Sequence, residues 1–592
     1  MGNPVRSVRW LAFASLVACS AAACGKCGEG PPKPAAVDLA PVPAPDRLLA
    51  DIFVMSPNQS WAKLQRGVGG PMGILPASAG GILCAAVGID PAVAFEVDGV
   101  SPAFGVLAGD PAAPSWGFAL KILDMRHART ILVDGETARY TAREGNGFTE
   151  LLPKGQGQPP HGAVALSNNG FLVVTKRPED LPVFGPYLTR NLPKAKAPEG
   201  AVVAEVPKSA IAQVIKPKLE ATWADAKQWL LAEDDRMRKD HGGRAPDYGD
   251  PKAIVAALDG LATRRLEVVG DLEKMRLVLE IDDRAATLVA TMFPAAGGGA
   301  ATKWVDGMKT GDAAAVLAMP QTSGVAFSMR DTEEERNAES LVIEKAITES
   351  LGERVGAAEG KRVHDIATSL AGARGETLGV ALAWDEPRGL LMRSAVKQRE
   401  PASQAITSLI ELGKASPFKE MLRVKDVVTS TEDVGGAKAN VAMITREARE
   451  KKKEEPKVID AKADAGFTMR PRTDVDAGAP HASKEALGFA WIVDDAALTI
   501  ATGGEPIVTL RNGTKPDKKL ADEPQTARAV GALGNSASTV IVAQPLRFSP
   551  IRANLPPAPV VVAIGKQDKN AFLKIDLSTG ILRELSRFGM GF

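Results

Sequence analysis

One pattern recurs four times along the 592-residue chain and constrains its fold more than any other sequence feature. In each copy, a polar or Gly/Pro-containing turn joins two short apolar segments, and a candidate helix follows at once. Such segments predict β-strands, and strands joined by short turns pair antiparallel. We therefore predict an α+β fold of duplicated modules, in which helices cover antiparallel β-hairpins. The strand pairs are 103–108 with 116–120, 266–269 with 275–281, 378–384 with 390–396, and 560–564 with 572–575.

The helix after each hairpin is placed by its capping residues. Asp and Ser cap helix starts, Pro favours the first turn, and Gly favours the end. A further hairpin is expected at 487–493 with 496–501. The expected helices open at Asp124, run from Asp283 to Phe293, run from Pro401 to Gly413, and run from Asp576 or Ser578 to near Gly589.

The two middle copies share a longer order of strand, long helix, short helix, hairpin and helix. Their first strands are expected at 201–206 and 325–329, and their short helices at 251–261 and 361–370. The long helices carry apolar residues at helical spacing, which predicts a face packed on the core. We expect helices on one sheet face, which leaves the other for a second sheet or a ligand. The two apolar stripes are Leu219, Trp223, Ala226 and Leu230, and Ile343, Ile347, Leu351 and Val355.

The N-terminus carries a targeting signal. Arg6 and Arg9 precede an uncharged, mostly apolar stretch at 10–18, which is too short to span a bilayer, and Leu-Val-Ala then leads into Cys19. This resembles a secretory signal that ends in a bacterial lipobox. The resemblance implies that the signal is cut before Cys19, that Cys19 is acylated, and that the lipid anchors the chain. Cys24, which follows three alanines, is the alternative processing site.

Changes in amino-acid composition along the chain indicate where its segments and modules begin and end. Pro, Ala and Gly dominate the residues after the signal, as in an extended stalk, and a later charged, apolar-poor segment is typical of a disordered linker. The predicted parts are a signal peptide (1–18), a stalk (19–46), three α+β modules (47–196, 197–310 and 311–446), a charged linker (447–484) and a C-terminal α+β module (485–592).

The overall composition argues against several classes of protein, among them nucleic-acid-binding proteins. The chain has 72 basic and 71 acidic residues, so no global field attracts nucleic acid. After the signal no apolar run is long enough for a membrane span. Only four cysteines occur, so the fold is not a disulfide scaffold, and Cys84 is expected as a small buried hydrophobe.

The strongest catalytic motif is that of a serine acyl-enzyme. Ser60-Trp-Ala-Lys63, Ser167-Asn-Asn and Lys309-Thr-Gly occur in the order of the three elements of penicillin-binding proteins, which they resemble. The contexts argue against the motif, because Lys309 follows a helix-like segment and the first element recurs elsewhere in the chain. The sequence predicts no catalytic residue, no cofactor site and no metal site, since the five histidines stand far apart.

The body resembles uncharacterised bacterial exported lipoproteins built from repeated strand-helix-hairpin units. The resemblance implies a cell-envelope lipoprotein, expected on the periplasmic face of the outer membrane, with a non-catalytic binding or scaffolding role. Its expected partners are the bilayer, through the acylated cysteine, and an apolar ligand or an envelope protein. The alternatives are the serine acyl-enzyme and a subunit of an envelope assembly.

Labelling with a palmitate analogue tests the lipobox. We expect the wild-type chain to be labelled and Cys19→Ala to lose the label, because the thiol is the acylated group. Cys27→Ala is the matched control and should keep it. Loss of label in Cys24→Ala, with label retained in Cys19→Ala, would move the site to Cys24.

Overall fold

The computed structural model describes residues 39–589, except 70–74, 146, 155–161, 197, 241–249, 384–387, 447–485 and 549–555. The fold is α+β, as the sequence predicts. The twenty strands of the described residues form one sheet, and every pairing between them is antiparallel. None of the described helices has the length and apolar composition that crossing a bilayer requires.

The first ten strands are β1 (Leu48–Val54), β2 (Ala103–Ala108), β3 (Ser115–Lys121), β4 (Tyr140–Glu144), β5 (Phe148–Pro153), β6 (Ala163–Ser167), β7 (Phe171–Thr175), β8 (Val202–Pro207), β9 (Leu272–Ile281) and β10 (Ala285–Pro294). The next ten are β11 (Ser323–Arg330), β12 (Arg374–Ala383), β13 (Gly389–Val396), β14 (Val424–Val434), β15 (Ala437–Arg446), β16 (Ala486–Val493), β17 (Ala497–Gly503), β18 (Ala537–Ala543), β19 (Val560–Gln567) and β20 (Asn570–Ser578).

The strand order reveals an internal duplication. The first half of the sheet runs β4-β5-β6-β7-β3-β2-β1-β8-β9-β10. The second runs β14-β15-β16-β17-β13-β12-β11-β18-β19-β20. Adding ten to each strand number of the first series gives the second. The duplicated unit is therefore ten strands long, and it is larger than a single hairpin module.

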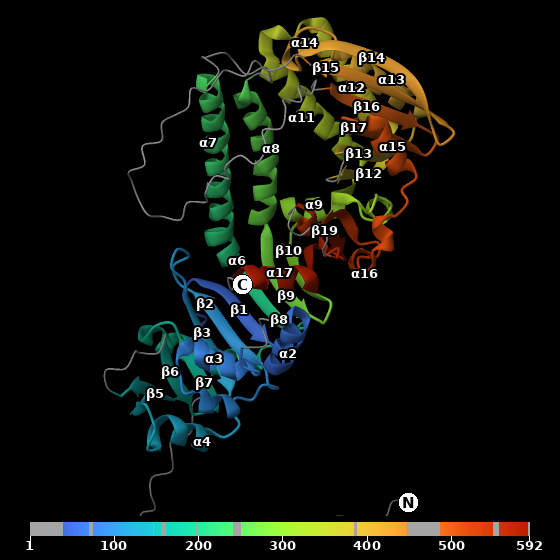
Figure 1. The fold of residues 1–592 in the computed structure, drawn as a ribbon. Helices are drawn as coiled ribbons and strands as arrows, with labels where there is room; N and C mark the ends of the chain where they lie inside the picture. The colour runs from blue at the N-terminus through green and yellow to red at the C-terminus, as the bar shows by residue number, and fades with distance from the viewer. Residues whose placement is uncertain are drawn as a thin grey trace, which may run out of the picture. The chain divides into compact units, whose positions relative to one another are not determined.

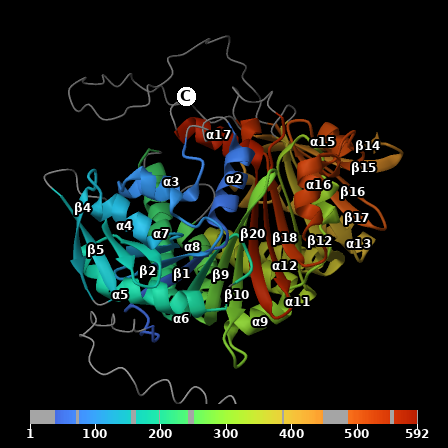
Figure 2. The ribbon, with the colours of Figure 1, turned by 90° about the horizontal axis from the view of Figure 1, so that it is seen from below.

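The two halves meet where equivalent strands pair. β10 and β20 form an antiparallel ladder from Ala285↔Ser578 to Met292↔Ala571, and Figure 2 shows β10 beside β20, with β9 on the far side of β10. Because the paired strands are equivalent and antiparallel, the halves are related by an approximate twofold axis perpendicular to the sheet. The four-module division of the sequence stays a prediction, although its boundary at 310/311 falls between the two halves.

The helices of the first half are α2 (Pro57–Val68), α3 (Ala79–Val87), α4 (Met125–Arg129), α5 (Leu181–Pro186), α6 (Lys208–Ala210), α7 (Lys216–Asp240), α8 (Pro251–Gly270) and α9 (Ala300–Gly307). Those of the second half are α10 (Ala314–Leu317), α11 (Glu333–Leu351), α12 (Ala357–Ala373), α13 (Arg399–Leu412), α14 (Phe418–Met421), α15 (Pro506–Thr514), α16 (Pro524–Gly531) and α17 (Thr579–Gly589). Figure 1 shows α7 and α8 as two long neighbouring helices, and α11, α12 and α13 beside the strands of the second half.

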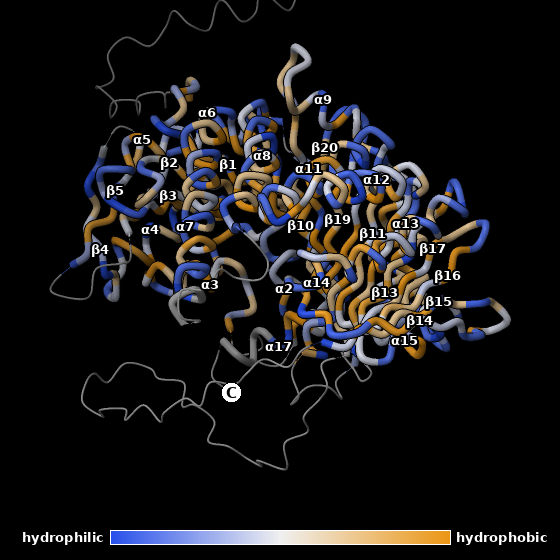
Figure 3. Tube along the Cα trace, turned by 90° about the horizontal axis from the view of Figure 1, so that it is seen from above, coloured by the Kyte–Doolittle hydropathy of each residue, from blue (hydrophilic) through white to orange (hydrophobic). Residues whose placement is uncertain are grey.

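Helices pack on both faces of the sheet, so the expectation of a single covered face is wrong. One face, here called the α16 face, packs α5 on Phe53 and Val203, and packs α15 and α16 on Val540. The other, here called the α11 face, packs α3 and α4 on Leu172 and Val174, and packs α13 on Trp491. Figure 3 shows hydrophobic residues along parts of β11, β13 and β19, although the side chains of these strands are not all buried.

The sequence places the second hairpin wrongly. Residues 266–269, expected as a strand, complete helix α8, and the predicted helix from Asp283 to Phe293 is strand β10. Asp283 does not begin a helix but lies in the β9–β10 turn. The carboxylate of Asp282 closes this turn by accepting hydrogen bonds from the backbone N–H groups of Arg284 and Ala285. β10 pairs on both sides, with β9 and β20, so tertiary pairing decides its conformation.

The other predicted hairpins are confirmed as β2–β3, β12–β13, β16–β17 and β19–β20. The helices that follow three of them are confirmed as α4, with Asp124 as its cap, α13 and α17. The first strands of the middle copies are β8 and β11. Cys84 is fully buried in α3, as expected, and burial raises the pKa of its thiol to about 11. The predicted signal peptide and linker, and the stalk as far as residue 38, lie outside the described residues.

A buried charge cluster fixes α11 and α12 to the sheet. Asp331 follows β11, and its carboxylate accepts a hydrogen bond of 2.8 Å from Nη1 of Arg336 in α11 and another from Arg374 at the start of β12. The side chains of Asp331 and Arg336 are 3% and 1% exposed. Nε of Arg336 also donates to the carbonyl of Ala371, near the end of α12. Through Asp331, Arg336 and Arg374, this cluster links α11 and α12 to β11 and β12.

We expect Asp331→Ala to lower the free energy of unfolding by about 3–5 kcal/mol, because it leaves two guanidinium groups buried without a counter-charge. Urea unfolding followed by circular dichroism measures the change. Asp365→Ala is the matched control, because its ion pair with Lys361 lies on the solvent side of α12 and is worth less than about 1 kcal/mol. An equal loss of unfolding free energy in Asp331→Ala and Asp365→Ala would contradict the stabilising role that we assign to the buried cluster.

Candidate functional site

A large apolar cavity lies on the α11 face, between helices of the second half and α8 of the first half. Its volume is about 610 Å³, within the range of roughly 300–1,000 Å³ that is usual for ligand sites. Side chains from α8, α11, α12, α13 and α14 surround it. The lining residues are Ile254, Ile343, Glu344, Ala346, Ile347, Ser350, Leu351, Val363, Ile366, Ala367, Leu370, Leu409, Leu412, Gly413, Phe418 and Leu422.

The cavity has a buried floor and an exposed apolar rim. Leu351, Val363, Ile366, Leu412 and Phe418 form the floor as one buried cluster. At the rim, Ile343 is 58% exposed, Leu409 is 45% exposed and Ile254 is 36% exposed. Large apolar side chains that face water around a concave site mark a binding surface, because covering them is favourable by about 25 cal/mol per Å².

The few polar groups of the lining are already paired. The hydroxyl of Ser350 donates to the carbonyl of Ile347, and the carbonyl of Ser350 accepts from the backbone N–H of Asp250. Oε2 of Glu344 lies 2.9 Å from Nδ1 of His364. The cavity therefore offers a ligand apolar contact along its length and one polar group, Glu344.

Sequence reasoning found part of this lining. Ile343, Ile347 and Leu351 belong to the predicted apolar stripe of the long helix, which was interpreted as a core face. Leu351 is buried, but Ile343 is exposed at the cavity rim. The contribution of Ile254 was not predicted, because α8 belongs to the other half of the sheet and reaches α11 only through tertiary packing.

The structure does not assemble the serine acyl-enzyme elements through any interaction among the described residues. Ser60 and Lys63 lie in α2. Ser167 ends β6, where its hydroxyl bonds to the side chain of Asn169 and accepts from the backbone of Phe171. Lys309 forms an ion pair of 3.1 Å with Glu376 in β12. The three motif elements therefore lie in different parts of the fold, and no hydrogen bond or ion pair among the described residues joins one of them to another.

The predicted lipidation residues, Cys19 and Cys24, lie outside the described part of the chain. Within that part, no group of three or more His, Cys, Asp or Glu side chains has the arrangement of a metal site.

A second cluster lies on the α16 face and is polar. Asp51 in β1 accepts a hydrogen bond of 3.1 Å from the hydroxyl of Tyr187, and its other carboxylate oxygen is buried without a partner. Burial raises the pKa of Asp51 to about 6, the Tyr187 hydrogen bond opposes this shift, and the charge of Glu205 directly across the ladder adds to it. Asp51 is thus a carboxyl group that takes up a proton near pH 6.

Comparisons with known proteins identify no family. No protein-family model matches the chain, and no curated protein matches it in sequence. Among solved structures, the chain is similar to crystal form III of the protein TP0453, with 7% identity and a TM-score of 0.21. The match covers 46% of this chain and 97% of that one.

Asp51 should make stability depend on pH. Its folded pKa lies above its ordinary value of 3.8, so the folded state holds a proton that the unfolded state releases, and stability falls as pH rises from about 4 to 6. In Asp51→Asn, we expect the fall in the free energy of unfolding over this pH range to be smaller by about 1–2 kcal/mol than in the wild type. This value allows for partial screening of the group by solvent. Urea midpoints across this pH range measure it.

Asp495→Asn is the control for this pH series, because the Asp495 side chain is 94% exposed. It should leave the pH dependence of the wild type unchanged. A wild-type slope that persists in Asp51→Asn would show that the carboxyl of Asp51 does not take up the proton.

Proposed function

We propose that the chain is a lipid-anchored protein of the cell envelope that binds an apolar ligand without chemical change. The observation that carries the binding role is the cavity on the α11 face, with its buried apolar floor and exposed apolar rim. The anchoring role rests on the lipobox-like segment that ends at Cys19.

The chemistry of the cavity favours a flexible hydrocarbon ligand. Burying one methylene group is worth about 0.8 kcal/mol, so a long alkyl chain gains enough from the apolar floor to bind without ionic contacts. Glu344 lies among the lining residues and pairs with His364. Because a carboxylate can accept more than one hydrogen bond, a ligand hydroxyl group can donate to Glu344 beside this pairing while its chain fills the apolar part.

The side chains that form the floor of the cavity support a carrier or a sensor more than a catalyst. The floor is formed by apolar side chains from α11 to α14, and none of them is a nucleophile, an acid or a base. The described residues of the lining therefore favour binding over bond-making chemistry. An anchored protein with such a cavity would hold a hydrophobic molecule near the membrane.

Filling the cavity tests the proposal. Ala367 lines it from α12, and we expect Ala367→Phe to occupy part of its volume and to weaken binding of the neutral dye N-phenyl-1-naphthylamine by about tenfold or more, since several methylene-sized contacts are lost. A fluorescence titration with the dye measures the dissociation constant. Native mass spectrometry after gentle extraction should show a co-purified apolar molecule in the wild type.

Thr368→Phe is the matched control, because it adds the same ring to the next residue of α12, which is exposed and does not line the cavity. It should bind the dye as the wild type does. Equal dye affinity in Ala367→Phe and the wild type would rule out this cavity as the binding site.

A further inference from the structure

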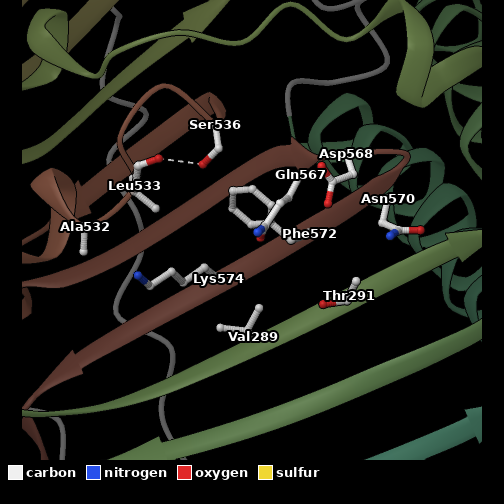
Figure 4. Close-up of a pocket in the computed structure, with 10 residues that line it drawn as sticks. All are labelled: Val289, Thr291, Ala532, Leu533, Ser536, Gln567, Asp568, Asn570, Phe572 and Lys574. Carbon is white, nitrogen blue, oxygen red and sulfur yellow. Dashed lines mark hydrogen bonds between the residues drawn. The ribbon is translucent and has the colours of Figure 1, made fainter. Parts of the chain in front are cut away.

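A separate groove crosses the seam between the two halves on the α16 face. Its volume is about 250 Å³, and its floor is formed by Val289 and Thr291 of β10 and by Phe572 and Lys574 of β20. In Figure 4, Lys574 lies on one side of Phe572, and Asp568 and Asn570, at the β19–β20 turn, lie on the other. The groove is thus built from both halves.

Among the described residues, no hydrogen bond or ion pair joins the ammonium group of Lys574 to another group. The nearest carboxylate along β20 is Asp576, but its two oxygens accept from Arg528 at 3.0 Å and from Thr287 at 3.1 Å. Arg528 and Asp576 thus compensate each other and leave the charge of Lys574 unbalanced.

The surroundings of Lys574 make this charge costly. Burial lowers the pKa of its amine, the charge of Arg528 lowers it further, and Asp576 opposes the shift. Val289 lies directly across the ladder from Lys574 on the equivalent strand of the other half. An apolar side chain is therefore accommodated at this point of the seam, and the sheet itself does not require a lysine there.

We propose that the groove binds a small monocarboxylate, with its carboxylate on Lys574 and its apolar body against Val289, Leu533 and Phe572. A volume of about 250 Å³ is below the usual range for drug-sized ligands, which limits the ligand to a few carbon atoms beyond the carboxylate or to one ring. At the far end, the Asp568 carboxylate disfavours a second negative charge. The groove and the apolar cavity lie on opposite faces of the sheet, so this inference does not rest on the proposed function.

Benzoate is a probe of the right size and charge. We expect it to bind the wild-type protein in an isothermal titration, and we expect Lys574→Met to weaken binding by about tenfold or more, as loss of a charge-assisted hydrogen bond predicts. Lys569→Met is the matched control, because Lys569 is exposed in the adjacent turn and does not line the groove. It should bind benzoate as the wild type does.

Two further measurements distinguish the proposal from a purely structural role of Lys574. The neutral analogue benzamide and the dianion terephthalate should each bind more weakly than benzoate, and benzoate should raise the titration midpoint of Lys574 measured by NMR of the ¹³C-methylated amine. Lys574→Met should unfold at a higher temperature than the wild type. Absence of benzoate binding at millimolar concentration, or equal binding in Lys574→Met, would overturn the proposal.

Discussion

The ladder between β10 and β20 is the interaction on which the rest of the structure depends, because among the described strands it alone joins the two halves of the sheet. Its eight residue pairs bring equivalent strands together in antiparallel orientation. Each strand would otherwise present an open edge, and an open edge recruits other strands. In this chain, the open edge of each ten-strand unit pairs with the same edge of the other unit. The ladder also creates the groove at Lys574, which takes side chains from both equivalent strands.

Duplication gives the halves one strand order but not the same covering elements. After β8 the chain forms the long helices α7 and α8, whereas after β18 it forms the short turn Pro545–Phe548 before the undescribed residues 549–555. α8 packs on α11 of the other half, and Ile254 thereby reaches the apolar cavity. The cavity therefore depends on α8, an element that only the first half possesses among the described residues.

Three ionisable groups, the buried Asp331 and the partly buried Asp51 and Lys574, show how the fold compensates charge. Asp331 has two arginine partners and belongs to the cluster that holds α11 and α12 on the sheet. Asp51 has one hydrogen-bond donor and one unpartnered oxygen, and burial raises its pKa. Lys574 has no hydrogen-bond or ion-pair partner among the described residues, and the apolar side chain of Val289 lies across the ladder from it. The cost of burying a charge is met by pairing at Asp331 and by neutralisation at Asp51, and at Lys574 we assign the compensating role to a ligand.

The sequence by itself determined the hairpins at β2–β3, β12–β13, β16–β17 and β19–β20, together with the helices that follow most of them, because alternation of side chains, turns and caps are local signals. It also carried the lipobox-like segment at Cys19. Only the tertiary structure decided that residues 285–294 form β10 in place of the predicted helix, because an apolar segment paired on both sides has no alternation to separate it from a helix. It alone assembled the apolar cavity from α8 and α11 to α14, and the groove at Lys574, because these join residues hundreds of positions apart that no spacing along the chain relates.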